Sequence, residues 1–244
     1  MAAKHYIKNP IILLSAILLA VCSPSTNIVN RKNKQLVRLA VIEVDTSQVK
    51  RYNELLKEEV EASIRLEPGV ITLYAVAEKR NPDRVTLFET YADSTHYKSH
   101  LATPHFQKYK QGTLKMVKHL DLIEMQPILY YRKPGLSNAR MEGLYIRLIK
   151  MELDSSAVEI FHTLGNTVML PGIRNEPGVF VMYAVAEKDH PTRVSILEVY
   201  ENLLAYEKHV ETPHYMKYKA ASKNAVKSLK LIDVDPILLG SKQQ

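Results

Sequence analysis

Residues 67–110 read EPGVITLYAVAEKRNPDRVTLFETYADSTHYKSHLATPHFQKYK, and residues 176–219 read EPGVFVMYAVAEKDHPTRVSILEVYENLLAYEKHVETPHYMKYK. The second segment repeats the first at an offset of 109 residues, with 23 of 44 positions identical and no gap. Self-similarity at one fixed offset indicates a repeated structural unit. The same offset aligns residues outside the two segments, namely Arg38 with Arg147, Asp45 with Asp154 and Pro127 with Pro236. A whole domain is therefore duplicated.

The duplication divides the chain of 244 residues into consecutive parts. Between the two copies lies a polar stretch with Pro134 and Gly135, which is typical of a linker. We therefore expect a signal segment over residues 1–22, a polar tether over 23–35, a first domain over 36–131, a linker over 132–143 and a second domain over 144–239.

Each copy has the same predicted order of elements. In the first copy, strand-like patterns cover residues 37–44, 70–78, 85–91 and 122–131. Apolar residues at helical spacing predict a helix between the first two strands, and Thr103 with Pro104 is typical of a helix start before the last strand. The order β-α-β-β-α-β is the ferredoxin-like pattern, and it predicts an α+β fold.

The first helix of the second copy is expected to differ from that of the first. Gly165, Pro171 and Gly172 stand where the first copy has Leu56, Ala62 and Ser63. Because proline inside a helix costs about 3 kcal/mol, we expect this helix to stop near Met169 and to lead into a loop. A pocket beside such a loop would make the two halves unequal.

The N-terminus resembles an export signal. Lys4 and Lys8 precede an 11-residue apolar run, residues 11–21, which is too short for the ~20 residues of a membrane-spanning helix. Cys22 follows directly in LAVC, which resembles a bacterial lipoprotein signal, although Val21 departs from the usual small residue. We expect lipidation at Cys22; the alternative is a cleaved secretory signal. Either signal predicts an exported bacterial protein, periplasmic or membrane-anchored.

The composition is that of a globular protein, with 46% apolar and 24% charged residues. The formal net charge of +7 includes Lys4 and Lys8 of the signal segment, and the remaining excess is mild for this length. No cluster of basic residues accompanies a nucleic-acid-binding motif. We therefore expect no nucleic acid among the partners.

The ordered set EPGV, a strand, FETY or LEVY, and HLATPHF or HVETPHY resembles the antibiotic biosynthesis monooxygenase family of the dimeric α/β-barrel superfamily. The resemblance covers both repeats. It implies that the antiparallel sheets of the two halves form one intramolecular barrel, so that the chain is a monomeric pseudo-dimer or a weak homodimer. It also implies pockets between sheet and helices, and chemistry on quinols or polycyclic aromatic compounds without flavin or metal.

The function implied by this resemblance is that of a cofactor-independent monooxygenase of a quinol-like or phenolic small molecule. A non-catalytic exported barrel that binds a small apolar ligand or a partner is the alternative, and an isomerase of a small phosphorylated metabolite is a lesser one. The chain contains no tryptophan, on which haem-degrading relatives depend, so haem degradation is disfavoured. We expect no cofactor.

Four residues are the candidates for acid–base catalysis: Glu89, Glu198, His100 and His209. Each glutamate lies in an otherwise apolar strand, where a carboxyl group must be paired or have a raised pKa. Each histidine ends the short helix and could meet the glutamate across a pocket, giving a pair suited to proton transfer. The structural alternatives are a glutamate that accepts bonds from a tyrosine or from backbone amides, and a histidine that closes its helix.

The candidates for substrate binding are repeated aromatic and imidazole side chains: Tyr74, Tyr183, Tyr97, Tyr206, His105, His214, Tyr109 and Tyr218. Packing in the core is the alternative for the tyrosines. His96 lies four residues before His100, but the second copy has Ala205 at that position and the sequence offers no third ligand. We therefore expect no metal site.

Overall fold

The computed structural model describes residues 35–134, 136 and 141–242. Cys22 and the rest of the predicted signal segment lie outside these residues, so export and lipidation stay predictions. Among the described residues, no helix is long and apolar enough to cross a membrane.

The two repeats have the same order of strands, but the second has two helices joined by a π-helical turn where the first has one continuous helix. The first contains β1 (Leu36–Val44), α2 (Val49–Leu66), β2 (Val70–Glu78), β3 (Arg84–Tyr91), α3 (Ser94–Leu101), α4 (Pro104–Thr113) and β4 (Val117–Arg132). The second contains β5 (Tyr145–Leu153), α5 (Val158–Leu164), a π-helical turn (Gly165–Met169), α6 (Leu170–Ile173), β6 (Val179–Glu187), β7 (Arg193–Tyr200), α7 (Leu203–Val210), α8 (Pro213–Ser222) and β8 (Val226–Ser241).

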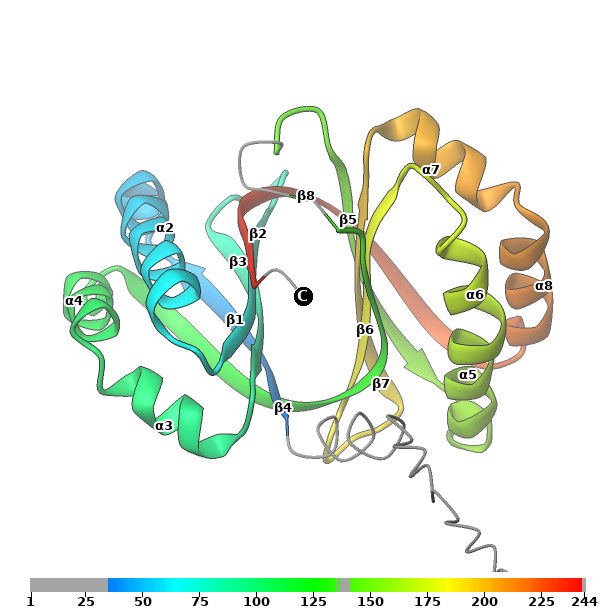
Figure 1. Ribbon diagram of the computed structural model, residues 1–244, viewed down its shortest axis with the longest axis horizontal. Helices are drawn as coiled ribbons and strands as arrows, with labels where there is room; N and C mark the ends of the chain where they lie inside the picture. Colours follow the sequence, from blue (N-terminus) through cyan, green and yellow to red (C-terminus); the bar gives the residue numbers. More distant parts are fainter. Residues whose placement is uncertain (1–34, 135, 137–140, 243–244) are drawn as a thin grey trace, which may run out of the picture. The chain divides into compact units, whose positions relative to one another are not determined.

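The strands of both repeats close into one antiparallel barrel in the order β1-β3-β2-β8-β5-β7-β6-β4 (Figure 1). The halves join twice, where β2 pairs with β8 and where β4 pairs with β6. Helices α2, α3 and α4 lie outside the barrel on one side, and α5 to α8 lie on the other (Figure 1). The predicted α+β fold, with two ferredoxin-like repeats in one intramolecular barrel, is confirmed.

The last strand of each repeat is longer than its pattern predicts, because it serves both halves. Strand β4 begins at Val117, five residues before the expected start at Leu122. Its first part pairs with β1 of its own repeat, and its last part pairs with β6 of the other. Pro127 lies at the bulge in the β4–β6 ladder, a position that tolerates the missing N–H of proline.

The prediction that the second repeat's first helix ends in a loop near Met169 is wrong. The chain stays helical from Val158 to Ile173, but the turn Gly165–Met169 is π-helical. Pro171 falls in the first turn of α6, where its missing N–H and its ring are best tolerated. A local change of helix type, rather than a break, therefore accommodates the proline.

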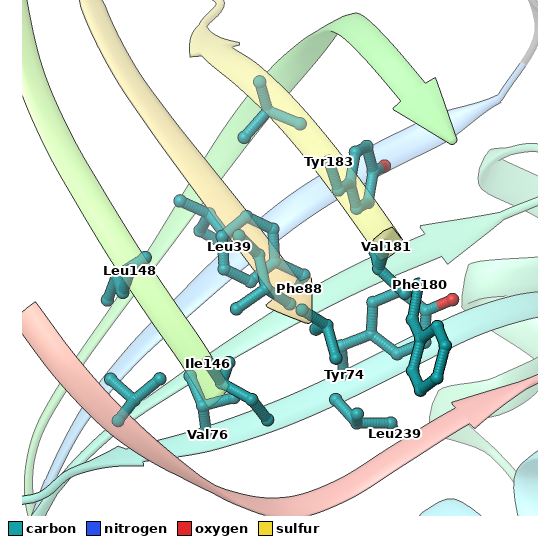
Figure 2. Close-up of a cluster of buried hydrophobic side chains, with 14 of the residues drawn as sticks. Leu39, Tyr74, Val76, Phe88, Ile146, Leu148, Phe180, Val181, Tyr183 and Leu239 are labelled. Atoms are coloured by element: carbon teal, nitrogen blue, oxygen red, sulfur yellow. The ribbon is translucent and has the colours of Figure 1, made fainter. Parts of the chain in front are cut away.

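Strand alternation separates two kinds of apolar layer. One face of every strand points into the barrel, and its interior is filled by packed side chains that include Leu39, Val76 and Phe88 (Figure 2). The opposite face packs against the helices. In the first half this outer layer joins Tyr52 and Leu56 of α2 to the sheet, and an equivalent layer exists in the second half.

Candidate functional site

A tight turn between the two short helices of the first half positions two histidines. His100 lies in the last turn of α3, and His105 is the second residue of α4. Between them, the hydroxyl of Thr103 accepts a bond from the backbone N–H of Phe106 and donates to the carbonyl of His100. Pro104 fits the first position of α4 because it needs no N–H partner there. This turn brings both imidazoles toward the end of α2.

Glu67, which follows α2 directly, joins the two histidines. Its Oε1 lies 2.9 Å from Nδ1 of His100 and 2.7 Å from Nε2 of His105. A carboxylate only accepts hydrogen bonds, so both ring nitrogens act as donors. Burial raises the pKa of Glu67, but the bonds from His100 and His105 outweigh this effect and hold the pKa below its ordinary value. Glu67 is therefore an ionised acceptor at neutral pH.

The second half repeats this triad. Oε1 of Glu176 lies 2.8 Å from Nδ1 of His209 and 2.8 Å from Nε2 of His214. Thr212 caps α8 as Thr103 caps α4. The equal geometry in two halves with different surroundings indicates that Glu, His and His form one structural unit.

Glu59 adds a second carboxyl group to the triad of the first half. This α2 side chain is 4% exposed, and its Oε1 lies 3.7 Å from Nε2 of His100. Ser63 donates a bond of 2.7 Å to the same oxygen. Burial raises the pKa of Glu59 to about 8, and burial also lowers the pKa of His100. At neutral pH, Glu59 therefore holds a proton beside a neutral imidazole.

The second half has no acid at this position. Val168 stands at the offset of 109 residues from Glu59 and lies in the π-helical turn. Nε2 of His209 is buried and finds no hydrogen-bond partner within the part of the chain that the structure describes. The two imidazoles thus share the bond to glutamate through Nδ1 and differ at Nε2.

The expected pairing of Glu89 with His100 does not occur, because Glu67 is the bonded carboxylate of His100. Glu89 lies on the same face of β3 as Leu87 and Tyr91, which pack against α2, and it accepts a bond of 3.1 Å from the hydroxyl of Tyr91. Burial raises the pKa of Glu89 to about 7, against the opposing effect of Arg38 on the neighbouring strand. Glu89 is a proton-holding group close to the triad rather than a member of it.

Glu198 is the counterpart of Glu89 in the second half. It is buried, and burial raises its pKa, while the charges of Arg147 and His209 act in the opposite direction. Arg147 lies opposite Glu198 in the ladder between β5 and β7. The structure therefore places Glu198 within the electrostatic reach of His209.

Four tyrosines that the sequence predicts to bind substrate lie in the short helices beside the triads, namely Tyr97, Tyr109, Tyr206 and Tyr218. The guanidinium carbon of Arg38 lies 4.4 Å above the ring of Tyr97, and that of Arg147 lies 4.5 Å above the ring of Tyr206. The hydroxyl of Tyr109 is 2.7 Å from that of Tyr52. Tyr218 packs against Phe161, which replaces Tyr52 and offers no hydroxyl.

Tyr74 and Tyr183 do not lie near the triads. Both side chains point into the barrel, on the face of the sheet opposite Glu89 and Glu198 (Figure 2). The hydroxyl of Tyr183 is 2.7 Å from that of Thr90, and the hydroxyl of Tyr74 is 3.2 Å from that of Tyr130. Successive strand residues alternate between faces, so these tyrosines cannot share a pocket with His100 or His209.

Two groups of side chains have residue types and spacing that suit a divalent cation. They are Glu59, His100 and His105 in the first half, and Glu176, His209 and His214 in the second, with ligand atoms within 4.8 Å of one another. Nitrogen and carboxylate donors of this kind bind zinc and other transition metals. The pair His96 and His100 is not such a site, because Nδ1 of His96 instead lies 2.8 Å from Asp93.

A cavity of about 260 Å³ opens at one end of the barrel, away from both triads. Its lining combines strand backbone with charged side chains, among them Glu43, Glu78, Arg84, Lys150 and Lys230. No residue of the Glu–His–His triads contributes to it. The hollow and the proton-transfer groups are therefore separate features of the molecule.

Sequence reasoning missed Glu59, Glu67 and Glu176. The repeat does carry a signal for two of them, because Glu67 and Glu176 occupy the same place in EPGV of each copy. Glu59 lies at helical spacing from Tyr52, Leu56 and Ser63, so the helical period places it on the buried face of α2. A carboxyl group on that face is a signal of the same kind as Glu89 in its strand.

Comparison with known proteins agrees with this architecture. Residues 36–112 and 144–221 each match the model of a family described as antibiotic biosynthesis monooxygenase. No curated protein matches the chain.

Solved structures show the same fold over most of the chain. A proposed monooxygenase from Lactobacillus acidophilus has 21% identity and a TM-score of 0.79, over 85% of this chain and 96% of that one. An anthrone oxidase-like protein has 11% identity and a TM-score of 0.56, over 86% and 94%. A proposed antibiotic biosynthesis monooxygenase from Bacteroides thetaiotaomicron has 54% identity over 43% of this chain and 97% of its own, with a TM-score of 0.40.

Proposed function

We propose that this chain, which belongs to the antibiotic biosynthesis monooxygenase family, oxygenates a quinol-like or phenolic small molecule without a cofactor. The observation that carries the proposal is the buried Glu–His dyad, formed by Glu67 with His100 and by Glu176 with His209. The similarity to an anthrone oxidase-like protein supports a phenolic substrate class.

The dyad supplies a general base. When Nδ1–H of a histidine donates to a carboxylate, the ring is held in one tautomer with the lone pair on Nε2. That lone pair can take the proton of a substrate hydroxyl, and the carboxylate then stabilises the imidazolium ion. The bonds of 2.8–2.9 Å between Nδ1 and the glutamates fit this role.

Deprotonation makes the substrate electron-rich enough to react with oxygen. One atom of the oxygen molecule enters the product, and the other leaves as water. The two electrons and two protons that reduce this second atom to water come from the substrate itself. Glu89, which holds its proton up to about pH 7, lies on the same buried layer and can return a proton. The substrate anion passes one electron to oxygen, and the apolar side chains between sheet and helices keep water away from the resulting radical pair.

The test is oxygen consumption with a panel of quinols and phenols in the presence of a chelator. We expect a His100→Ala/His209→Ala double variant to lose about 10²–10⁴-fold in rate, because general-base catalysis contributes that much. His190→Ala, which changes an exposed loop histidine, is the control. Equal rates for wild type and double variant with every active substrate would show that the dyads are not the base.

A non-catalytic binding protein is the second candidate, and the cavity at the end of the barrel favours it. Its charged lining suits a polar ligand better than the apolar one expected from the sequence, because the barrel interior is already filled by packed side chains. Tight binding of a compound from the same panel, without oxygen consumption, would support this candidate.

A further inference from the structure

The cavity at the end of the barrel is built by both halves of the chain. It lies where β1, β2 and β5 end and where β3, β4 and β8 begin. Its volume of about 260 Å³ suits a small molecule, and a second hollow of about 280 Å³ shares Glu78 and Lys230 with it. Arg84 and Lys230 are exposed, so a solute can reach the side chains that line the cavity.

Strand alternation turns two lysines of the second half into this end of the barrel. Lys150 follows Ile146 and Leu148 at intervals of two residues on β5, and Lys230 precedes Ile232 by two residues on β8. The three apolar side chains belong to the packed interior of the barrel. The two lysines therefore lie on the interior face of the sheet, at the point where the packed layer gives way to the cavity.

These lysines repel each other. They lie directly opposite in the ladder between β5 and β8, and like charges at such positions destabilise a sheet. Burial lowers the pKa of Lys150, and the carboxylates of Glu78 and Glu187 oppose this effect. The charges of Lys230 and Arg84 reinforce it. Three cationic side chains of the cavity thus lie within electrostatic reach of one another.

The first half shows that the fold does not require the two lysines. At the offset of 109 residues, Val41 stands in place of Lys150 and Asp121 in place of Lys230. Val41 and Asp121 also lie opposite each other, in the ladder between β1 and β4, and this pair involves no repulsion between like charges. The second half therefore keeps an unfavourable pair at positions where the same fold accepts other residues.

The acidic residues of the cavity do not pair with its cations. In the second half, Nη1 of Arg193 lies 3.5 Å from Oε2 of Glu187. Its counterpart Arg84 forms no ion pair with Glu43 or Glu78 in the part of the chain that the structure describes, although all three side chains line the cavity. An anion that enters the cavity can therefore supply the partner that the protein does not.

We propose that this cavity binds a small dianion, either a phosphate group or a dicarboxylate, between Arg84, Lys150 and Lys230. Both kinds of anion present several acceptor oxygens, to which ammonium and guanidinium groups donate charge-assisted bonds. A bound anion replaces the repulsion between the lysines by attraction. The proposal rests on the second candidate function, whose ligand class it names, and it involves no residue of the Glu–His dyads.

Isothermal titration calorimetry of the purified protein with inorganic phosphate and with succinate, at constant pH and ionic strength, tests the assignment. We expect one equivalent to bind. Lys150→Val and Lys230→Asp give the second half the residues of the first, and each should weaken binding about tenfold or more, as for loss of a hydrogen bond from a charged group. The double variant should not bind. Lys217→Val, which changes an exposed lysine of α8, is the control.

Thermal unfolding shows whether the variants fold. Each removes a like-charge contact, so without phosphate it should unfold at the same temperature as the wild type or higher. Phosphate should stabilise the wild type and not the double variant.

Binding of neither anion to the wild type, or equal affinity in the folded double variant, would overturn the proposal. Binding of one anion alone would support it and show whether the site takes a phosphate group or a dicarboxylate. Oxygen consumption reports on the dyads and calorimetry on the cavity. The oxygenase proposal and the anion site can therefore fail independently.

Discussion

Glu59 places a buried carboxyl group beside the histidine triad of the first half, and the second half has Val168 at the equivalent position. A carboxyl group that is 4% exposed is stable there only while it keeps its proton, because burial penalises the charged form. Ser63 and His100 provide polar neighbours, but neither carries a positive charge that would favour ionisation at neutral pH. Glu59 therefore makes the stability of the whole protein depend on pH.

Replacing Glu59 by glutamine should remove this dependence. The folded pKa of about 8 lies above the ordinary value, so the folded state holds an extra proton between about pH 4 and pH 8. The resulting stability is complete below that window and is lost as the pH rises through it. At pH 9, Glu59→Gln should be more stable than wild type by about 5 kcal/mol, with little difference at pH 4.

Urea unfolding at pH 4, 7 and 9 measures this effect. Glu58→Gln is the matched control, because Glu58 is exposed and its pair with Lys108 should contribute less than about 1 kcal/mol at any pH. Parallel pH profiles for wild type and Glu59→Gln would contradict a protonated Glu59. A residual slope is expected in both proteins, since burial also raises the pKa of Glu89.

At the scale of elements, the first helix of each repeat decides what its histidines meet. Helix α2 is continuous over 18 residues and directs Glu59 at His100. In the second half the π-helical turn Gly165–Met169 interrupts the α-helical geometry, and Gly172 lies against the ring of His214. Turns of this kind occur often at functional sites.

Two glycines in this helix should respond in opposite directions to alanine. A Cβ atom at Gly172 would lie 2.3 Å from Cγ of His214, so the ring must move away from Glu176, and Gly172→Ala should lose about 1–3 kcal/mol of stability. A Cβ atom at Gly165 would meet Ile128 at an ordinary 3.7 Å, so Gly165→Ala should gain about 0.5–1 kcal/mol from helix propensity. Denaturant unfolding of both variants checks the pair; destabilisation by Gly165→Ala alone would show that the π-helical turn depends on its glycine.

At the scale of the molecule, closure of the barrel leaves no unpaired edge among the described strands. Strand β2 finds its second neighbour in β8 of the other repeat, and β6 finds its second neighbour in β4. An exposed strand edge favours pairing with another chain, and here each half covers the edges of the other. The tandem chain thereby assembles its barrel without a second copy.

Protein lacking residues 1–22 should therefore be a monomer in solution. Light scattering over a range of concentrations measures its mass directly. A chain restricted to residues 36–132 leaves β2 and the end of β4 without partners, so it should dimerise or aggregate. An obligate dimer of the tandem protein at every concentration would contradict the intramolecular barrel.

The sequence by itself determined the repeated architecture and most element positions, because periodic burial and capping are local properties. The strand pattern of YAVAEK, the Thr-Pro helix starts and the α2 period are all confirmed in the structure. The sequence also indicated His100, His209, His105 and His214 as candidate site residues, because they recur at the same positions of both repeats. Their catalytic and binding roles stay predictions.

Only the tertiary structure decided which groups these residues meet. Glu67 and Glu89 both recur in the second repeat, and the sequence does not distinguish between them as partners of His100. His100 bonds to Glu67 because the turn between α3 and α4 lies against the end of α2. Tyr74 and Tyr183 are not part of the site, because their side chains point into the barrel and the triads lie on the other face of the sheet. Contacts between distant elements depend on how the helices pack over the sheet. This packing places Glu59 against Nε2 of His100, whereas Nε2 of His209 has no hydrogen-bond partner among the described residues.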